Sequence, residues 1–459
     1  MSKLSPKASP HAVGCLVYSP AFHYLLLGSY CMLDIRLIRE NSGLIKAKLA
    51  ARGKSLDAAI DAVLECDADC RLAKTRLQLL YAERRRLSRQ VEKLRRGEGG
   101  APLQAEATAN SLGEEINALN SRTTELNLRQ KDLLLQLPNL PEEAVPHGTS
   151  ASANPTLRTW GNPSEKSTTE DHVAIGRRLG LFDFNRAAKI SGSGFLCFTG
   201  AGARLERSLL NFLLDLHTVQ HGYREVNTPL LVHRECMVGT GQLPKFEEDM
   251  YAVNGDSSRL FLAPTAEVPV TNLYRDEVLN ISHLPLCFVA YTPCFRREAG
   301  SAGRDTRGMI RLHQFDKVEL VKICEVEDSE QELQSLTVDV EKVLQLLDLP
   351  YRVVELCTGD LGFSASHTYD IEVWSPGQGS FLEVSSCSNF RDFQSRRMNL
   401  RYKDFNGKSR FAHTLNGSGT ALPRLYVALL ENHVQSDGSV LLPQSLRGYF
   451  RADCIEPVS

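Results

Sequence analysis

Residues 288–323 decide the fold. They begin with Phe288-Val-Ala-Tyr-Thr-Pro-Cys-Phe-Arg-Arg-Glu298, followed by a loop of ten small and charged residues. After Met309 they end with Ile310-Arg-Leu-His-Gln-Phe-Asp-Lys-Val-Glu-Leu-Val-Lys-Ile323. Both ends are rich in β-branched and aromatic residues and contain no internal glycine, which predicts two strands. The loop between them, residues 299–308, is too polar to continue either strand. The stretch is therefore expected to form an antiparallel hairpin with a long loop.

Strand alternation sorts the side chains of this hairpin. Arg296 and Glu298 are expected on one face of the first strand. One face of the second strand is expected to carry Arg311, His313, Phe315, Lys317 and Glu319. A charged face can simply be the solvated side of an edge strand. Two paired strands that bring arginine, an aromatic ring and carboxylates together favour a binding surface instead. Arginine suits phosphate and carboxylate groups, the ring can stack on a base, and a carboxylate can hold an amino group. The combination suits a nucleotide together with an amino acid.

Five short sequence motifs carry a resemblance to a known family. Phe295-Arg-Arg-Glu298 with Arg311 and Phe315 resembles motif 2 of the class II aminoacyl-tRNA synthetases, and the surrounding motifs resemble the bacterial-type seryl-tRNA synthetases. These motifs are Thr265-Ala-Glu267, Gly300-Ser-Ala-Gly-Arg-Asp-Thr-Arg307, His313-Gln-Phe-Asp-Lys-Val-Glu319, Glu383-Val-Ser-Ser386 and His413-Thr-Leu-Asn-Gly-Ser-Gly419. The resemblance runs from about residue 32 to the C-terminus. It implies an α+β fold, in which an antiparallel α-helical coiled-coil arm precedes a class II catalytic domain built on an antiparallel β-sheet flanked by helices.

The resemblance also implies the site residues. Arg296, Glu298 and Arg424 are implied in catalysis. The serine site would comprise Thr265, Ala266, Glu267, Arg296, Glu319, Thr414, Asn416 and Ser418. The ATP site would comprise Arg296, Arg297, Glu298, Leu312, His313, Gln314, Phe315, Glu383, Val384, Ser385, Ser386 and Arg424.

Within that pattern, Arg296 bridges the amino-acid carboxylate and the α-phosphate, Glu298 accepts from the adenine amino group, and Phe315 and Arg424 sandwich the ring. Glu319 would hold the ammonium and hydroxyl groups of serine.

Mg²⁺ is implied as a cofactor beside ATP, with Glu383 and Ser386 as its protein ligands. Carboxylate and hydroxyl oxygens suit Mg²⁺ that is held mainly by nucleotide phosphates. Strict alternation would place residues 383 and 386 on opposite faces of a strand, so either a β-bulge between them or the end of the strand is expected there. Pro423 precedes Arg424 where bacterial relatives usually have glycine, and it removes a backbone donor there.

Composition sets the general class of the protein. The 459 residues allow two or three domains, and 42 % hydrophobic with 24 % charged residues is ordinary for a globular protein. The net charge of −2 means that any nucleic-acid-binding surface must be local. Twelve cysteines without a CxxC pair indicate thiols in a reducing cytoplasm rather than disulfides or a zinc site.

The N-terminal 31 residues fit nothing downstream. Pro20 and His23 interrupt their apolar run, which argues against a signal peptide or a membrane span. The family pattern Met-Leu-Asp-Ile-Arg begins at Met32, so residues 1–31 are expected to be a disordered extension or a misassigned start.

Residues 56–94 and 105–137 each carry a heptad repeat, separated by a glycine-rich turn, which predicts an antiparallel helical hairpin reaching about 60 Å. Only Arg84 interrupts the first apolar seam. Residues 71–96 contain ten bases and two acids, a net +8. Such a run can be a merely solvated helix face, but its concentration on a projecting rod favours RNA. The tRNA-binding residues expected by the resemblance are Arg76, Arg84, Arg85, Arg89 and Lys93 on the arm, and Arg304 and Arg307 in the hairpin loop.

The expected domains are therefore the extension 1–31, the arm 32–140, a proline-rich linker 141–170 and the catalytic domain 171–459. Within the last, an amphipathic helix over residues 203–221 and a strand at 223–229 resemble motif 1, which implies a homodimer interface.

The resemblance implies that the protein activates L-serine with ATP and transfers the seryl group to tRNA(Ser), and by family expectation also to tRNA(Sec). No membrane is expected among its partners. Two alternatives stay open: a synthetase-like ligase that loads another acceptor, and a non-catalytic RNA-binding paralogue.

Overall fold

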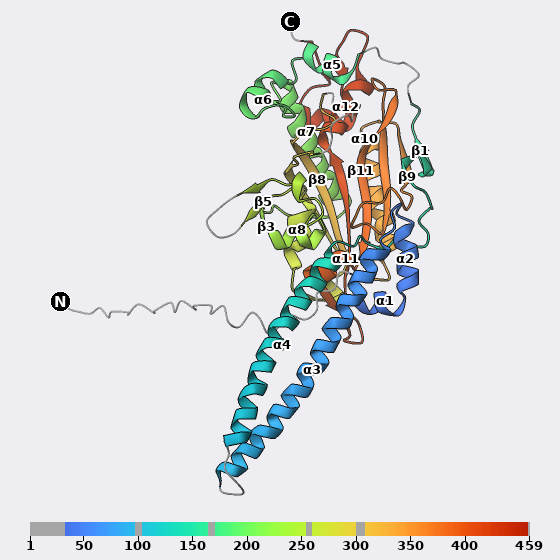
Figure 1. Ribbon diagram of the computed structural model, residues 1–459. Coiled ribbons are helices and arrows are strands. Elements are labelled where there is room, and N and C mark those ends of the chain that lie inside the picture. The colour runs from blue at the N-terminus through green and yellow to red at the C-terminus, as the bar shows by residue number, and fades with distance from the viewer. Residues whose placement is uncertain (1–32, 97–102, 164–169, 254–258, 300–307, 458–459) are drawn as a thin grey trace, which may run out of the picture.

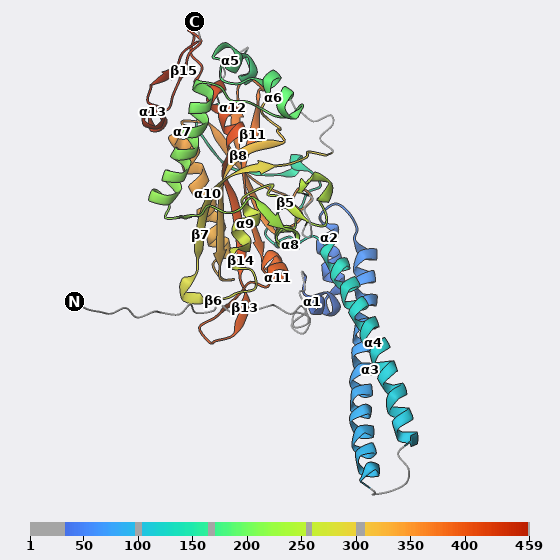
Figure 2. The same cartoon turned by 90° about the vertical axis from the view of Figure 1, so that its left-hand side faces the viewer.

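The computed structural model describes residues 33–96, 103–163, 170–253, 259–299 and 308–457 (Figure 1). The N-terminal extension with Met32, the turn at 97–102, and Arg304 and Arg307 lie outside the described residues. A long helical hairpin projects from a sheet-based body (Figures 1 and 2). None of the described helices is both long and apolar enough to cross a bilayer.

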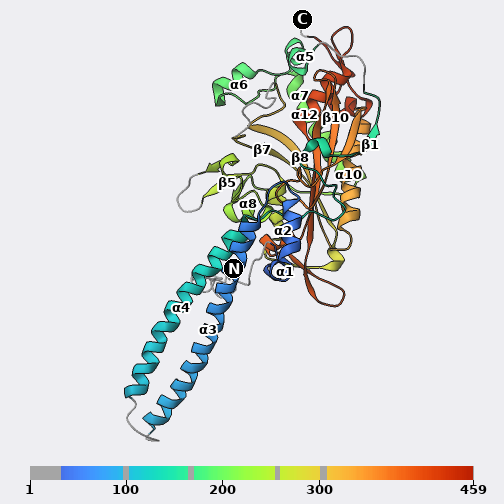
Figure 3. The same ribbon diagram turned by 45° about the vertical axis from the view of Figure 1, so that its right-hand side comes forward.

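The two heptad segments form the arm, as α3 (Asp57–Arg95) and α4 (Leu103–Leu135). The buried seam residues are Val63, Cys66, Cys70, Ala73, Leu77, Leu80 and Leu87 on α3, facing Leu112, Ile116 and Leu126 on α4. Burial of each large aliphatic side chain contributes about 1.5–3 kcal/mol, so the seam holds the helices together. Arg84 is exposed, with its guanidinium 5.3 Å from the Tyr81 ring centroid, so it turns out of the seam that it interrupts. Two short helices, α1 (Ile35–Glu40) and α2 (Ser42–Ala50), lie at the base of the arm beside the body (Figure 3).

An eight-stranded sheet organises the body, and every neighbouring pair is antiparallel except β2 with β7. In spatial order its strands are β1 (Thr156–Trp160), β9 (Tyr351–Glu355), β10 (His367–Ser375), β11 (Ser380–Arg391), β14 (His413–Ala421), β8 (Gln314–Cys324), β7 (Leu286–Phe295) and β2 (Arg224–Glu225). The fold class expected from the sequence is therefore confirmed.

Helices cover one face of the sheet and build the main core. The helices on this face are α7 (Ala201–Asp215), α10 (Ser329–Leu346) and α12 (Leu422–His433), and α5 (His172–Arg178), α6 (Phe184–Ser191) and α13 (Gln444–Phe450) add side chains to the same core. Val318 and Leu320 of β8 pack into this core, whereas their neighbour Val321 packs with Ala266 and Phe288 on the opposite face. Alternation along β8 thus gives the sheet a helix-covered side and a second side that carries the polar residues.

Smaller elements surround that second side. They are β3 (Leu231–His233), α8 (Arg234–Thr240), β4 (Ala252–Val253), β5 (Leu260–Leu262), α9 (Glu267–Thr271), β6 (Val278–Asn280), α11 (Phe393–Met398), β12 (Arg401–Lys403) and β13 (Ser409–Phe411), with β15 (Val440–Leu441) and β16 (Cys454–Ile455) near the C-terminus. Single turns are η2 (Ala151–Ala153), η4 (Glu247–Asp249), η5 (Asn272–Tyr274), η6 (Ile281–His283) and the π-turn η3 (Leu216–Gln220) after α7.

Four details of the structure differ from the expectations. The central hairpin forms, but β7 ends at Phe295 and β8 begins at Gln314, so the sequence overestimated both strands. Glu298 has φ of +51°, which takes it out of strand geometry, and simple alternation fails there. The expected linker 141–170 contains β1, which pairs with β9 as an edge strand. The residues of β1 directly follow Pro155, and a proline is tolerated at the beginning of an edge strand. The strand expected at 223–229 is only the two residues of β2.

Candidate functional site

The site lies on the side of the sheet away from the main helices, where β8, β14 and β11 present polar residues. The hairpin connection supplies its first group. Arg296 leaves β7 directly after the strand ends, and its backbone N–H still pairs with the His313 carbonyl at 2.9 Å. Its Nε donates to the Pro264 carbonyl at 3.3 Å. Glu298, although displaced from the strand, accepts a 2.6 Å bond from Arg311 Nη1. The connection therefore gathers two arginines and a carboxylate at the end of the hairpin.

Thr265 joins the start of α9 to β8. Its hydroxyl accepts a hydrogen bond from the Glu267 backbone N–H at 3.2 Å and donates to Glu319 Oε2 at 3.0 Å. The first bond stabilises the start of the helix, and the second fixes a carboxylate that is 1 % exposed. Lys317, two residues along the same face of β8, forms an ion pair with Glu319. Glu319 is therefore held as a buried carboxylate by two partners.

Glu267 is a second buried carboxyl group in this region. Its Oε1 accepts a 2.7 Å bond from Gln394 Nε2, and Gln394 Oε1 accepts a 2.7 Å bond from the Thr414 hydroxyl. Burial, followed by the negative charge of Glu319, raises the pKa of Glu267 to about 7. The region thus favours an additional positive charge near neutral pH.

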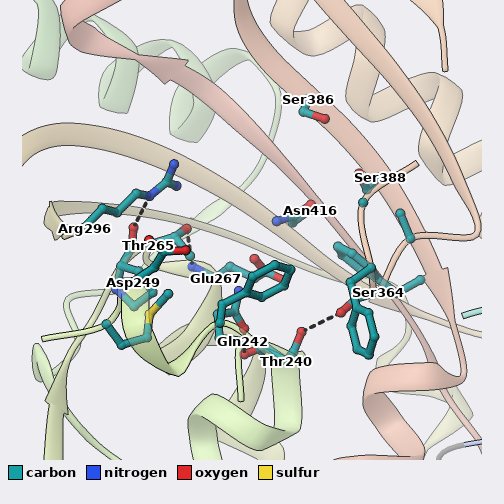
Figure 4. A pocket seen from close by; sticks show the side chains of 18 of the residues that line it. Thr240, Gln242, Asp249, Thr265, Glu267, Arg296, Ser364, Ser386, Ser388 and Asn416 are labelled. Atoms are coloured by element: carbon teal, nitrogen blue, oxygen red, sulfur yellow. Dashed lines mark hydrogen bonds between the residues drawn. The ribbon is translucent and has the colours of Figure 1, made fainter. Parts of the chain in front are cut away.

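These groups border a cavity of about 520 Å³, within the range of small-molecule sites. Figure 4 shows Arg296, Thr265 and Glu267 on one side of it and Ser364 across from them. We call this space the larger cavity. Its polar lining is Thr240, Gln242, Asp249, Thr265, Glu267, Arg296, Glu298, Arg311, Ser364, Ser386, Ser388 and Asn416.

A second cavity of about 250 Å³, the smaller cavity, adjoins the first and shares Arg296, Glu298 and Arg311 with it. It is also lined by Phe315 and Arg424. The guanidinium of Arg296 lies 5.2 Å from the Phe315 ring centroid, an arrangement typical of a cation–π contact. The smaller cavity therefore combines an aromatic face with positive charge, and Arg296 stands at the junction of the two cavities.

Arg424 is anchored at the start of α12. Its Nη1 donates to the Glu383 carbonyl at 2.6 Å and lies 3.1 Å from Glu383 Oε2. Pro423 stands in the first turn of the helix, where a missing backbone donor costs no helical hydrogen bond. The proline is therefore compatible with an arginine presented to the cavity.

Of the two arrangements expected near residues 383–386, a β-bulge or a strand end, β11 has the β-bulge. Ser385 pairs with Ile371 and Glu383 with Glu372, which leaves Val384 unpaired. Val384 belongs to the helix-side core, and the Ser385 hydroxyl lies 3.7 Å from the core thiol of Cys387. Both turn away from the cavities, so Glu383 and Ser386 face the polar side together.

The fit of this pair to a metal can be judged from its donor atoms. One carboxylate and one hydroxyl suit Mg²⁺ that takes its other ligands from phosphates and water. Across the described residues there is no group of three or more His, Cys, Asp or Glu placed to hold a metal ion. The chain thus offers a partial site that a nucleotide would complete.

The sequence-predicted residues divide between the two cavities. Thr265, Glu267, Arg296, Glu298, Ser386 and Asn416 line the larger cavity, and Arg296, Glu298, Leu312, Phe315, Glu383, Ser418 and Arg424 line the smaller. Ala266, Arg297, His313, Gln314, Glu319, Thr414, Val384 and Ser385 line neither of the two. Several of these support their neighbours instead: His313 Nδ1 donates to the Arg296 carbonyl at 3.0 Å, and Thr414 orients Gln394.

Sequence reasoning missed Thr240, Gln242, Asp249, Ser364 and Ser388 of the larger cavity. Thr240, Gln242 and Ser364 lie at the end of α8 or on connections, and Asp249 is in the single turn η4, so no periodic pattern marks them. Lys317 was placed on the correct face by alternation but was given no role.

The arm presents a separate charged surface. Arg76, Arg84, Arg85, Arg89 and Lys93 are all exposed on α3. Arg76 pairs with Glu115 of α4 at 2.8 Å. The basic run predicted from the sequence thus lies on the outside of the projecting hairpin.

Comparisons with known proteins agree with this arrangement. Residues 251–433 match the family model of the class II tRNA synthetase core domain (G, H, P, S and T), and residues 32–141 match that of the seryl-tRNA synthetase N-terminal domain. The chain is 55 % identical to a serine–tRNA ligase of Akkermansia muciniphila, over 93 % of this chain and 99 % of the relative. It is 49 % identical to a serine–tRNA ligase of Pelotomaculum thermopropionicum, over 91 % and 98 %.

A solved structure extends the likeness to three dimensions. Seryl-tRNA synthetase from Pyrococcus horikoshii, complexed with ATP, matches with a TM-score of 0.85 at 36 % identity, over 93 % of this chain and 100 % of that one. The cytoplasmic serine–tRNA ligase of Naegleria fowleri, in complex with AMP, matches with a TM-score of 0.81 at 27 % identity, over 93 % and 99 %.

Proposed function

The chain belongs to the seryl-tRNA synthetase family of class II aminoacyl-tRNA synthetases, and from this premise we propose that it is a serine–tRNA ligase that works through the two adjoining cavities. Serine and ATP give seryl-adenylate and pyrophosphate, and the seryl group then passes to tRNA(Ser). The observation that carries the assignment of the site is the position of Arg296 between a cavity lined by the buried carboxyl group of Glu267 and a cavity with an aromatic and cationic lining.

In this proposal, serine occupies the larger cavity. Its ammonium and hydroxyl groups interact with the Glu319 carboxylate at the Thr265 side, and its carboxylate points toward Arg296. ATP occupies the smaller cavity, with adenine between Phe315 and Arg424 and its amino group donating to Glu298. Alanine would leave hydroxyl-binding groups unpaired, which is the physical basis for its rejection.

The reaction needs no protein nucleophile. A carboxylate oxygen of serine attacks the α-phosphorus, the bond to the β-phosphate bridging oxygen breaks, and pyrophosphate leaves. Arg296 stabilises the charge that develops at the α-phosphate. In the second step a terminal ribose hydroxyl of the tRNA attacks the seryl carbonyl carbon and AMP leaves. Mg²⁺, when held by the phosphates with Glu383 and Ser386, would neutralise part of the phosphate charge.

The surrounding parts take roles that fit the family. Residues 32–140 form the arm that grips tRNA, 171–459 form the catalytic domain, and 141–170 connect them while lending β1 to the sheet. We propose a homodimer through α7 and β2, and a cytoplasmic location, which is supported by ten free thiols among the described residues. tRNA(Sec) is proposed as a further substrate on the family expectation.

The alternatives are weaker. A ligase that loads a carrier protein gives no reason for the long basic arm, and a non-catalytic RNA-binding paralogue gives no reason for Arg296, Glu298 and Arg424 to converge.

Pyrophosphate exchange into ATP tests the proposal, with serine, threonine, alanine or no amino acid. Exchange with serine alone is expected, and Arg296→Ala should abolish it. Arg410→Ala is the matched control, because Arg410 is on β13, pairs with Glu327 at 2.7 Å and touches neither cavity. A folded protein that shows no exchange with serine would contradict the synthetase assignment.

A further inference from the structure

The base of the arm is bonded to a loop that lines the larger cavity. This loop, residues 361–365, is called here the pocket loop. Arg52 follows α2, and its guanidinium is largely buried. Nη2 donates to the Leu361 and Gly362 carbonyls at 2.9 and 2.6 Å, and Nη1 donates to the Ala365 carbonyl at 3.2 Å. One side chain from the arm thus binds both ends of the loop.

Asn139, just beyond α4, binds the middle of the same loop. Its backbone N–H donates to the Phe363 carbonyl at 2.9 Å, and its Nδ2 donates to the Ser364 and Phe390 carbonyls at 2.9 and 2.8 Å. Arg52 Nη1 also donates to the Asn139 carbonyl at 3.2 Å. The two residues therefore form one connected clamp on the loop backbone, with Arg52 at the ends and Asn139 at the centre.

The other side of the pocket loop reaches the site. Gly362, Phe363, Ser364 and Ala365 all line the larger cavity, with Ser364 across from Arg296 (Figure 4). The Ser364 hydroxyl donates to the Thr240 carbonyl at 3.1 Å. Gln394 Nε2 lies 3.3 Å from the same carbonyl and also donates to Glu267. A continuous set of hydrogen bonds thus runs from the arm base to a carboxyl group of the cavity.

A third contact supports the loop from behind. Arg397 Nη2 donates to the Leu135 carbonyl, the last residue of α4, at 3.3 Å. Its guanidinium lies 4.2 Å from the Phe393 ring centroid and 5.7 Å from that of Phe363. The end of α4 and the aromatic side chain of the loop are therefore fixed by the same residue.

We propose that Arg52 and Asn139 are positioning residues for the amino-acid pocket: through the pocket loop, the base of the arm sets the wall of the larger cavity. The inference rests on the proposed function only in taking that cavity as the serine site. It gives the arm a second role that needs no tRNA. The basic run on α3 serves RNA, whereas the arm base shapes the site for the first reaction step.

The proposal predicts a selective kinetic effect. The pocket loop lines the larger cavity and does not line the smaller one. Loss of the clamp should therefore raise the KM for serine and leave the KM for ATP and the exchange rate at saturating serine close to wild type. A merely structural role would lower the amount of folded enzyme, and hence the apparent kcat, without this split.

The experiment is pyrophosphate exchange with the full chain and no tRNA. Arg52→Ala should raise the KM for serine at least about fivefold, the lower end of ordinary coupling between sites. Arg52→Lys should have an intermediate effect, because a lysine ammonium does not reproduce the hydrogen bonds of the planar guanidinium. Because this variant retains the positive charge, it also tests the proposal if Arg52→Ala folds poorly. Lys48→Ala is the control, since Lys48 is on α2 and pairs at 3.6 Å with Glu143, away from the loop. Thermal melting verifies folding.

The outcomes separate cleanly. A selective rise in the KM for serine supports the clamp. An unchanged KM for serine in folded Arg52→Lys and Arg52→Ala, or an equal rise in both KM values, overturns it. Absence of serine-dependent exchange in the wild-type protein would instead count against the proposed function.

Discussion

Replacing the buried carboxylate of Glu319 tests the proposed serine site most directly. Glu319→Gln keeps the shape of the side chain and its bond from Thr265, but it removes the negative charge beside Lys317. A hydrogen bond to a charged group contributes about 1.5–3 kcal/mol, and about 1.4 kcal/mol corresponds to a factor of ten. The kcat/KM for serine in pyrophosphate exchange should therefore fall about 10- to 100-fold. The preference for serine over alanine should fall with it, because the contact with the hydroxyl group is weakened.

The same change should lower stability, since Lys317 is 6 % exposed and would lose its counter-charge. Breaking a buried ion pair costs about 3–5 kcal/mol, which urea unfolding would detect. Glu341→Gln is the matched control. Glu341 is also 6 % exposed and pairs with Arg158 at 2.6 Å, but it is on α10 on the helix side of the sheet. It should lose stability and keep its KM for serine. A folded Glu319→Gln protein with wild-type kcat/KM for serine would refute the reasoning.

Three further results are expected. Reversing charge on the arm with Arg85→Glu and Arg89→Glu should weaken tRNA binding and reduce the slope of log Kd against log salt by about 2, measured by filter binding with Arg122→Glu on α4 as control. Because burial and Glu319 raise the pKa of Glu267 to about 7, the folded state binds the proton of Glu267 more tightly than the unfolded state does. The free energy of unfolding should therefore decrease by on the order of 3 kcal/mol as pH rises from about 4.5 to 7. Glu267→Gln should abolish this decrease, measured by urea unfolding at pH 5 and pH 8. Glu383→Ala should raise the Mg²⁺ concentration for half-maximal exchange at least about tenfold, and an unchanged requirement would remove Glu383 from the metal site.

The parts of the structure that follow a period were predictable from the sequence. Heptads gave the arm helices, and alternation placed Phe315, Lys317 and Glu319 on one face of β8. A bulge or a strand end was predicted between Glu383 and Ser386, because two polar residues three apart do not share a face of a regular strand, and the structure has the bulge. Each of these predictions depends only on local backbone geometry, which neighbouring residues determine.

The wall of the larger cavity was not predictable in this way. The pocket loop is held by Arg52 and Asn139, which are more than 200 residues away in the chain. Its residues follow no period, so nothing local marks them as cavity-lining. Glu298 shows the same limit on a smaller scale. Its positive φ arises where the chain leaves the strand, and its partner Arg311 is across the whole hairpin loop.

The charges of the larger cavity explain how a substrate would be oriented before any reaction. Glu319, which is bonded to the cavity residue Thr265, already has a partner in Lys317, whereas the buried Glu267 accepts from the neutral amide of Gln394 and has a raised pKa. A substrate ammonium near these two carboxyl groups would lower the pKa of Glu267 and release its proton below about pH 7. The positive guanidinium of Arg296 stands at the other side, at the junction with the smaller cavity. A zwitterionic amino acid therefore has one favourable direction, with its ammonium toward the carboxyl groups and its carboxylate toward the nucleotide, which is the direction that adenylate formation requires.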